Sequence, residues 1–461
     1  MAKPKTKQKK DIQKSGNKKK FPENENLLVK PLTELKSSLH QYKILGEQEV
    51  PDDINVYQYF FPNSERDCEY RHRRSILDEY HADSYLRKSI YYGYFQLFFM
   101  FSCYFFVCHP LTRFFDQGYF MQSQLISWVS QDLLQVFALW PQMVVYLHVG
   151  YILQIVKLPS KIEKILQFIW SILSFYLFSY YIPFTTYKNW VNTSRAFSAI
   201  CNIAMTMKFH SYMVENRKFR KEDPKYKPKY KDFLYFVCAP AFIFQKQFPR
   251  NEKIEWKFFL IKSIFSLMGC IGIYFLTNDW LLPILETAEK TDFVTLLLEL
   301  IEICFYFNLA VFYLIFENIM QGIAELTRFA DREFYRDWWN TTNYIDFFTK
   351  NNRPLYNFSL KYIKTPIMQK FKISHKLGNY IILCFMAIMH ELVIVVVSQT
   401  FTPFVLIIFI LQLPLIGLLQ KFEGGDWGNI IFWFLYLLAV PLVVAIYIKS
   451  NQILALFDTY N

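Results

Sequence analysis

The sequence contains little glycine, with 13 residues of this type in a chain of 461, and it lacks glycine-rich phosphate-binding patterns. No phosphate loop, dinucleotide-binding fingerprint or nucleophile-elbow motif occurs in it. Its eight cysteines show no CxxC or other metal-ligand spacing, and they lie at positions 68, 103, 108, 201, 238, 270, 304 and 384. Most of them lie within apolar runs, where a cysteine behaves as a small apolar residue. The sequence therefore predicts neither a metal site nor a disulfide framework.

The N-terminal region lacks the features of a cleavable targeting segment. Residues 1–20 hold nine lysines, one aspartate and no arginine, without the apolar core of a signal peptide. We expect them to form a disordered cytosolic tail and not a secretory or mitochondrial leader. The formal net charge of +12 does not indicate nucleic-acid binding, because the basic runs flank long apolar runs. Positive charge in that position is typical of the cytosolic loops of membrane proteins.

Long apolar runs dominate the remainder of the chain, in which hydrophobic residues make up 53% of the total. Runs of roughly 20 apolar residues are long enough to cross a bilayer as helices. The sequence therefore predicts an all-α polytopic membrane protein with about nine transmembrane helices. The expected spans are 91–110, 130–156, 164–186, 194–213, 257–276, 296–326, 376–399, 402–420 and 429–449.

The distribution of lysine and arginine predicts the topology of these spans. Residues 215–232 contain eight such residues, and the connector 327–374 is also basic, so both are expected in the cytosol. The N-terminus then lies in the cytosol and the C-terminus in the lumen. Residues 21–90 are expected to include a helix on the cytosolic membrane surface. Residues 233–248 are too short to span the bilayer and indicate a re-entrant or interfacial segment.

One apolar run, residues 381–397, is interrupted only by His390 and Glu391. An acidic side chain at the centre of an inserting helix costs about 2.5–3.5 kcal/mol, and ionisable residues at that depth usually face a cavity. From the residues alone, two interpretations stay open. The pair either lines a functional cavity, or the histidine bonds a neighbouring helix while the glutamate caps a nearby one. Two other isolated histidines, His148 and His210, are interpreted as structural.

A string of aromatic and charged residues opens the basic connector, namely Phe334, Tyr335, Arg336, Asp337, Trp338, Trp339 and Asn340. Such a string is also typical of an interfacial helix. It resembles the FYxDWWN signature of the membrane-bound O-acyltransferase superfamily, in the branch of sterol O-acyltransferases and type 1 diacylglycerol O-acyltransferases. The resemblance covers about residues 68–455. RRSILDE (73–79) and MKFHSYMVEN (207–216) are similar to the sterol enzymes, whereas residues 231–250 and the Gln412-Leu413-Pro414 triplet are similar to the diacylglycerol enzymes.

The resemblance implies a reaction chamber inside the membrane, with acyl-CoA entering from the cytosol and a lipid alcohol entering from the bilayer. His390 matches the catalytic histidine of the family, Asn352 matches a second catalytic residue, and Gln412 matches a glutamine beyond the histidine. The string 334–340, Glu391 and Gln412 are implied to bind substrate. The chemistry fits, because a neutral histidine in a water-poor cavity can take the proton of an attacking hydroxyl. Acyl-CoA is a co-substrate, and no metal or redox cofactor is required.

The sequence departs from the family pattern at four positions. Asn351 replaces a tryptophan and Tyr356 replaces a histidine, both beside Asn352, while Leu392 replaces a tyrosine and Val440 a glutamine. The change at Leu392 exchanges one wall residue for another. The changes at Asn351 and Tyr356 favour either an altered acceptor or a scaffold without its chemistry.

Three functions stay open on these residues. The first is an acyl-CoA-dependent O-acyltransferase that converts diacylglycerol to triacylglycerol, and the second is a sterol O-acyltransferase that makes steryl esters. The third is a catalytically degenerate subunit that binds lipid or has a structural role in a larger membrane complex. A channel or transporter is disfavoured because no inverted repeat occurs.

The resemblance also implies an endoplasmic reticulum membrane location and a homodimer. The expected division of the chain has three parts: a tail and membrane-surface segment at 1–67, the acyltransferase domain at 68–455, and a short tail at 456–461.

Overall fold

The computed structural model describes residues 68–122, 126–127, 130, 132–186, 190, 192–399, 401–419 and 426–450. The two predicted tails, 1–67 and 456–461, lie outside the described residues, so the predicted division of the chain stays a prediction. The described residues form helices, and their β pairing consists of two isolated bridges, Arg73 with Asp331 and Arg250 with Phe329. The all-α prediction is confirmed for this part of the chain.

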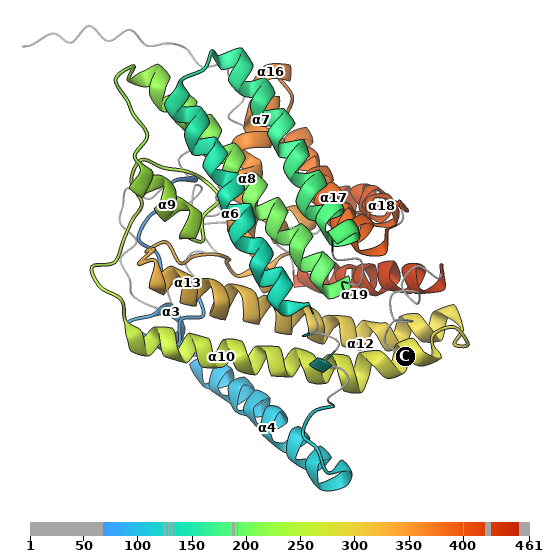
Figure 1. Cartoon of the computed structure of the whole chain (residues 1–461). Coiled ribbons are helices and arrows are strands. Elements are labelled where there is room, and N and C mark those ends of the chain that lie inside the picture. Colours follow the sequence, from blue (N-terminus) through green and yellow to red (C-terminus); the bar gives the residue numbers. More distant parts are fainter. Residues whose placement is uncertain are drawn as a thin grey trace, which may run out of the picture. The chain divides into compact units, whose positions relative to one another are not determined.

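Figure 1 shows the helices coloured in their order along the chain. In the first half they are α3 (Tyr85–Lys88), α4 (Tyr92–Gln117), α6 (Leu133–Val156), α7 (Ser160–Phe175) with the π-helix η3 (Tyr176–Thr186), α8 (Asn192–Glu222) and α9 (Tyr230–Cys238). The next group is α10 (Trp256–Phe275), η4 (Leu276–Leu281), α11 (Leu282–Thr287), α12 (Phe293–Phe312), η5 (Tyr313–Ile319) and α13 (Met320–Leu326). The last group is η6 (Trp338–Asn340), α14 (Tyr344–Asn351), α15 (Arg353–Ser359), η7 (Leu360–Lys364), α16 (Thr365–Phe371), α17 (His375–Ser398), α18 (Phe404–Leu419) and α19 (Asp426–Lys449).

Six helices of the described chain are long and apolar enough to cross a membrane. They are Leu134–Val156, Ser160–Phe184, Trp256–Thr287, Phe293–Leu326, His375–Ser398 and Trp427–Lys449. The multi-pass membrane prediction is therefore supported, whereas the count of nine spans is not confirmed. The other three predicted spans coincide with helices α4, α8 and α18, which do not meet the same criterion.

Helix α8 shows why a helix of this bundle can be less apolar than a lipid-facing span. It packs against α6, α7 and α17, so much of its surface faces protein. Its Asn202 amide donates to the carbonyl oxygen of Ser174 at 3.2 Å and to the hydroxyl of Ser179 at 2.9 Å. Polar side chains inside a membrane bundle are stable when neighbouring helices provide such partners.

The connections between helices gather at two ends of the bundle in Figure 1. The α8–α9 connection and α13 lie toward the left of the view and α16 at the top, whereas the α11–α12 connection lies at the right. That the basic loops 215–232 and 327–374 share one side, and that this side is cytosolic, stay predictions.

Part of the segment before the first predicted span can be compared with its expectation. The sequence predicts a surface helix in residues 21–90, of which 21–67 lie outside the described residues; residues 68–84 form turns and irregular backbone against the bundle, and α3 (Tyr85–Lys88) is a short helix. The backbone N–H of Arg73 donates to the carbonyl oxygen of Ala330 at 3.0 Å, and the N–H of Arg332 donates to that of Arg73 at 2.9 Å. The segment therefore pairs with the chain just before the FYRDWWN string (residues 334–340).

A buried ionic network joins this segment to two helices of the bundle. The ammonium group of Lys262 on α10 lies 2.8 Å from a carboxylate oxygen of Glu79 and 2.8 Å from one of Glu317 on η5. The side chains of Lys262 and Glu317 are 0% and 1% exposed. Ser75 and Tyr335 each donate a hydroxyl hydrogen bond of 2.6 Å to Glu317. A buried charge is tolerated only when it is paired and hydrogen-bonded in this way.

We predict that Lys262→Ala strongly lowers the thermal stability of the purified protein in detergent. Removal of the ammonium leaves two buried carboxylates without their counter-ion, and breaking a buried pair in this manner costs about 3–5 kcal/mol. Lys257→Ala is the matched control, because Lys257 is exposed in the first turn of the same helix. A triple variant with Lys262→Met, Glu79→Gln and Glu317→Gln should recover much of the lost thermal stability. Equal melting temperatures for Lys262→Ala and Lys257→Ala would contradict the structural importance of the network.

Candidate functional site

His390 lies in the second half of α17, the most apolar stretch of the predicted catalytic region. Its Nδ1 atom is 2.7 Å from the carbonyl oxygen of Met386, one turn earlier. A carbonyl oxygen can only accept, so Nδ1 carries the hydrogen and Nε2 of the neutral ring keeps its lone pair. The ring stacks on Phe409 of α18 at 6.2 Å between centroids. The histidine side chain is exposed at the surface of the described chain. Its free nitrogen therefore has the form that a general base needs.

Glu391, the next residue, has a different environment. Its side chain is buried, and one carboxylate oxygen accepts the backbone N–H of Leu406 at 3.1 Å. The other oxygen accepts from the hydroxyl of Tyr447 on α19 at 3.3 Å. Leu406 lies in the first turn of α18, where the helix leaves backbone N–H groups without partners and favours a negative charge. Glu391 therefore caps α18 and joins it to α19.

The stretch around Asn352 forms a corner between two short helices. Asn352 precedes α15, and its side-chain oxygen accepts the backbone N–H of Leu355 at 3.2 Å. Tyr356 is 4% exposed and belongs to one apolar cluster with Ile382 and Met386 of α17. The carbonyl of Met386 is the group that holds His390. The structure thus brings the Asn352 corner against α17, and Asn352 itself is used as a helix cap.

The FYRDWWN string lies against this corner through its backbone. The N–H of Arg336 donates to the carbonyl oxygen of Lys350 at 2.8 Å, and the N–H of Arg353 donates to that of Phe334 at 3.0 Å. These two bonds flank Asn351 and Asn352, so the structure places the string and the corner together. Residues that lie far apart in the sequence therefore form one connected region on the predicted cytosolic side.

The side chains of the string fall into two groups. Phe334, Tyr335 and Trp338 are buried, with exposed fractions of 2%, 1% and 3%. Burial raises the pKa of the Tyr335 hydroxyl well above its usual value, and the adjacent Glu317 carboxylate acts in the same direction. Asn340 is exposed, and the remaining three residues are half-buried. The buried group packs in the core, whereas the other four members of the string are at least partly accessible.

Most charges in this region are paired with one another. The carboxylate of Glu333 lies 3.3 Å from Arg73, 3.1 Å from Arg336, and in contact with Arg353. Burial raises the pKa of Asp331, although the nearby arginines act in the opposite direction. Asp337 lies 3.7 Å from the ammonium group of Lys350. Lys350 also pairs with Asp346 at 2.9 Å, and Arg73 lies 3.7 Å from Asp331. The basic and acidic side chains of this paired network therefore balance one another.

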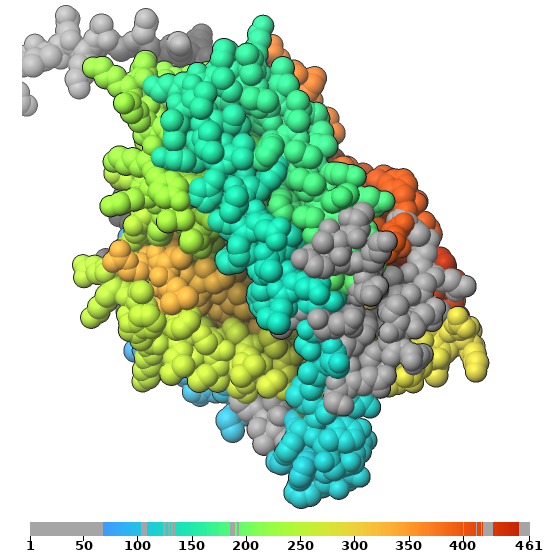
Figure 2. All heavy atoms as spheres, in the orientation of Figure 1, coloured from blue at the N-terminus to red at the C-terminus, as the bar shows by residue number. Residues whose placement is uncertain are grey.

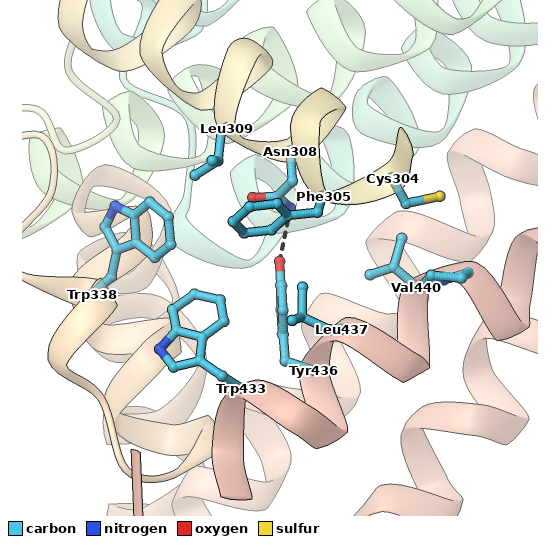
Figure 3. A pocket seen from close by; sticks show the side chains of 10 residues that line it. Cys304, Phe305, Asn308, Leu309, Trp338, Trp433, Tyr436, Leu437 and Val440 are labelled. Atoms are coloured by element: carbon cyan, nitrogen blue, oxygen red, sulfur yellow. Dashed lines mark hydrogen bonds between the residues drawn. The ribbon is translucent and has the colours of Figure 1, made fainter. Parts of the chain in front are cut away.

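Trp338 also borders a narrow apolar pocket between α12 and α19. Figure 3 shows Trp338 and Trp433 on one side of it, Val440 on the other, and a dashed line between Asn308 and Tyr436. That line is a 2.8 Å hydrogen bond from the Asn308 amide to the Tyr436 hydroxyl. Inside the pocket, the centre of a water-sized sphere can occupy about 10 Å³. This volume corresponds to roughly one water molecule. The pocket is too narrow for an acyl chain, and His390 does not line it.

Two sequence expectations are not tested by this geometry. The side chain of Gln412 lies outside the described residues, although its backbone belongs to α18. The enclosed chamber implied by the resemblance is not confirmed, because His390 is exposed within the described part of the chain. The predicted catalytic and substrate-binding roles therefore stay predictions.

Sequence reasoning missed three residues that hold this region together. They are Lys262, Tyr447 and Asn429, whose amide donates to the carbonyl oxygens of Trp339 and Thr341 at 3.0 and 2.7 Å. Each is a polar residue within or beside an apolar run, and such residues are usually retained for a reason. The sequence shows these polar residues, but it does not show which groups they bond.

The sequence of this chain is similar to those of known proteins. The model of the membrane-bound O-acyltransferase family matches residues 124–449, which include the string, the Asn352 corner and His390. Diacylglycerol O-acyltransferase 1 of Dictyostelium discoideum is 31% identical over 275 residues, which are 54% of this chain and 44% of that protein. Probable sterol O-acyltransferase 1 of Schizosaccharomyces pombe is 28% identical over 309 residues, or 62% and 55% of the two chains. Diacylglycerol O-acyltransferase 1 of Homo sapiens is 26% identical over 235 residues, or 49% and 47%.

The chain spans about half the length of the curated relatives that it matches. These relatives are named for two different acceptors, so their names do not decide the acceptor of this chain. The predicted resemblance to this branch is confirmed.

We predict that Glu391→Ala lowers the melting temperature because it leaves the Leu406 N–H and the Tyr447 hydroxyl with one partner fewer. The loss of a buried acceptor of this kind costs about 1–3 kcal/mol. Glu391→Gln, which keeps an acceptor oxygen, should be milder. Glu299→Ala is the control, because Glu299 is an exposed carboxylate on α12. If Glu391→Ala melts like the control and changes only a substrate KM, the capping role is wrong and Glu391 contacts substrate.

Proposed function

We propose that this chain, which belongs to the membrane-bound O-acyltransferase family, transfers a fatty acyl group from acyl-CoA to the hydroxyl of a lipid alcohol. The observation that carries the proposal is His390, whose Nδ1 lies 2.7 Å from the Met386 carbonyl oxygen, on an apolar membrane helix inside the family match. The first acceptor that we propose is diacylglycerol, with triacylglycerol as the product.

In the proposed reaction, Nε2 of His390 takes the proton of the acceptor hydroxyl as its oxygen attacks the thioester carbonyl carbon. The carbon–sulfur bond then breaks, the new ester is released, and the departing thiolate of CoA takes the proton from the imidazolium. A base whose ordinary pKa lies near neutrality suits both proton transfers. The reaction needs acyl-CoA as a co-substrate, and we propose no metal or redox cofactor.

The string 334–340 and Asn352 are proposed to serve the acyl-CoA side. Acyl-CoA is anionic, so positive charge beside its path favours its approach. The half-buried Arg336, which pairs with Glu333 at 3.1 Å, is the residue of the string that we propose contacts the phosphates of acyl-CoA. Substrate contacts of Glu391 and Gln412 remain part of the proposal, although the bonds of Glu391 also give it a structural role. The proposed location is the endoplasmic reticulum membrane, with a cytosolic N-terminus and a homodimer or larger complex as the assembly.

The sterol alternative rests on the sequence similarity of RRSILDE and MKFHSYMVEN to sterol enzymes. In residues 73–79 and 207–216, several side chains form hydrogen bonds with other elements and so stabilise the fold. Ser75 and Glu79 bind the Lys262–Glu317 network, and Lys208 donates to the carbonyl oxygens of Phe236 and Ala239 at 2.8 and 2.6 Å. Similarity in residues that serve the fold carries no information on the acceptor. This favours diacylglycerol as the first acceptor to test.

We predict that His390→Ala abolishes acyl transfer while the melting temperature stays near that of the wild type. The exposed ring has few packing contacts, so its removal costs little stability but removes the base. The measurement is ester formation from labelled oleoyl-CoA with diacylglycerol, sterol and long-chain alcohol acceptors. His375→Ala is the matched control, because His375 is an exposed histidine in the first turn of the same helix. Retained activity with early melting would make His390 a structural residue.

The non-catalytic alternative rests on Asn351 and Tyr356, which replace a tryptophan and a histidine of the family. Restoring both residues, Asn351→Trp with Tyr356→His, should leave the activity unchanged or raise it. If the wild type transfers to no acceptor and the double variant gains activity, the chain is a decayed acyltransferase. If the wild type is active and the double variant is not, the two residues set an altered substrate preference. The assay is the same panel of acceptors.

A further inference from the structure

A row of lysines runs from the α8–α9 connection into the first turn of α9 and alternates with other residues. The row consists of Lys225, Lys227, Lys229 and Lys231, all exposed. Tyr226 and Pro228 between them are half-buried, and the hydroxyl of Tyr226 donates to the side-chain oxygen of Asn216 at 3.0 Å. Lys227 and Lys229 lie in the irregular segment before α9, Lys225 lies in the turn before it and Lys231 in the first turn of α9, and all four side chains are exposed while Tyr226 attaches the segment to α8.

Helix α9 continues this pattern with an apolar stripe. Phe233, Phe236 and Val237 are buried against the bundle. On the other side, Tyr230 is 46% exposed, Leu234 is 43% exposed and Cys238 is exposed. Residues four apart lie on one face of a helix, so these three form a continuous stripe. A stripe of this kind beside a row of lysines is typical of a helix that lies in a membrane interface.

Contacts with α6 place the stripe at membrane depth. The Tyr230 hydroxyl lies 3.1 Å from Nε2 of His148, and its ring lies 5.2 Å from that of Tyr151. His148 and Tyr151 lie eight and five residues before α6 ends at Val156. At 1.5 Å per residue these positions are roughly 8–12 Å inside the end of the span. The start of α9 therefore lies level with the last turns of a membrane span and not out in the cytosol.

We propose that residues 225–238, the interfacial segment, bind anionic phospholipids of the surrounding leaflet. The stripe faces acyl chains, and the lysine row reaches the headgroup phosphates. The row has four positive charges against the single carboxylate of Asp232, and lysines commonly extend from an apolar surface to a polar interface. Acidic neighbours offer little competition, because Glu222 pairs with Lys246 at 3.7 Å and Asp223 accepts the backbone N–H of Lys225. Figure 2 shows the part of the surface to which this segment belongs at the left of the molecule.

The first experiment measures lipid selectivity in phosphatidylcholine nanodiscs that hold the whole protein. Spin-labelled phosphatidylserine should associate more strongly than spin-labelled phosphatidylcholine with the wild type. Replacing the four lysines of the row by glutamine should lower this preference about fivefold or more, since each lysine near an anionic surface contributes to it. The control replaces four exposed lysines elsewhere, Lys253, Lys370, Lys372 and Lys376. It should keep the wild-type preference.

An equal loss in both quadruple variants would overturn the proposal, because general charge and not the row would then be responsible. An unchanged lipid preference with weaker binding of soluble CoA would overturn it too, and would assign the row to the nucleotide. This measurement does not depend on acyl transfer, so its failure is distinct from failure of the proposed function.

The second experiment tests depth. A water-soluble maleimide should modify Cys238 in nanodiscs at least about tenfold more slowly than it modifies a cysteine in Lys221→Cys, a position exposed near the end of α8. Mass spectrometry of the labelled peptides identifies each site. Comparable rates would place α9 in water and overturn the proposal.

Discussion

The pairing of the buried Lys262 ammonium with Glu79 and Glu317 is the interaction on which the part of the structure around the FYRDWWN string depends. A charge without a partner at this position would be strongly unfavourable, so the three groups must come together as the chain folds. Their meeting brings the segment 68–84 onto α10, and it brings η5 beneath Tyr335. The FYRDWWN string then has a defined position, because Tyr335 bonds the same carboxylate. A site built on irregular backbone needs such a support, since the string itself contains only one short 3₁₀ turn.

Polar groups in the apolar part of the chain fall into two kinds, and their bonds distinguish them. Both carboxylate oxygens of Glu391 are occupied by groups from α18 and α19, so this residue joins helices. The adjacent His390 uses one ring nitrogen to hold its orientation and leaves the other available. The rotation of the helix separates two consecutive side chains by about 100° around its axis, so Glu391 can face the bundle while His390 faces outward. The structural interpretation therefore holds for Glu391, whereas the functional interpretation of His390 stays a prediction.

The long helices could be predicted from apolar length alone, and the string 334–340 and His390 could be recognised through the family resemblance. The partners could not. Lys262 and Glu79 lie 183 residues apart, and Tyr447 lies 56 residues from Glu391, so no local pattern relates them. The π-helical turn Tyr313–Ile319, which carries Glu317, has no signature that hydrophobic periodicity detects. Residues 68–84 are irregular where Arg73 exchanges backbone bonds with Ala330 and Arg332, and such pairing is not local.

Tyr356 shows how a departure from the family pattern can be compatible with the rest of the site. It packs with Ile382 and Met386, and the carbonyl of Met386 fixes the tautomer of His390. A tyrosine fills this space with an aromatic ring and does not change charge near neutral pH. Tyr356 therefore keeps an apolar contact with α17, and the proposed proton transfers involve only the imidazole of His390. Asn352 is consistent with this division, because its side-chain oxygen is bound to the Leu355 N–H and fixes the corner beside the string. Within the described part of this region Nδ1 of His390 is held by the Met386 carbonyl, and Nε2 is the atom on which the proposed acyl transfer depends.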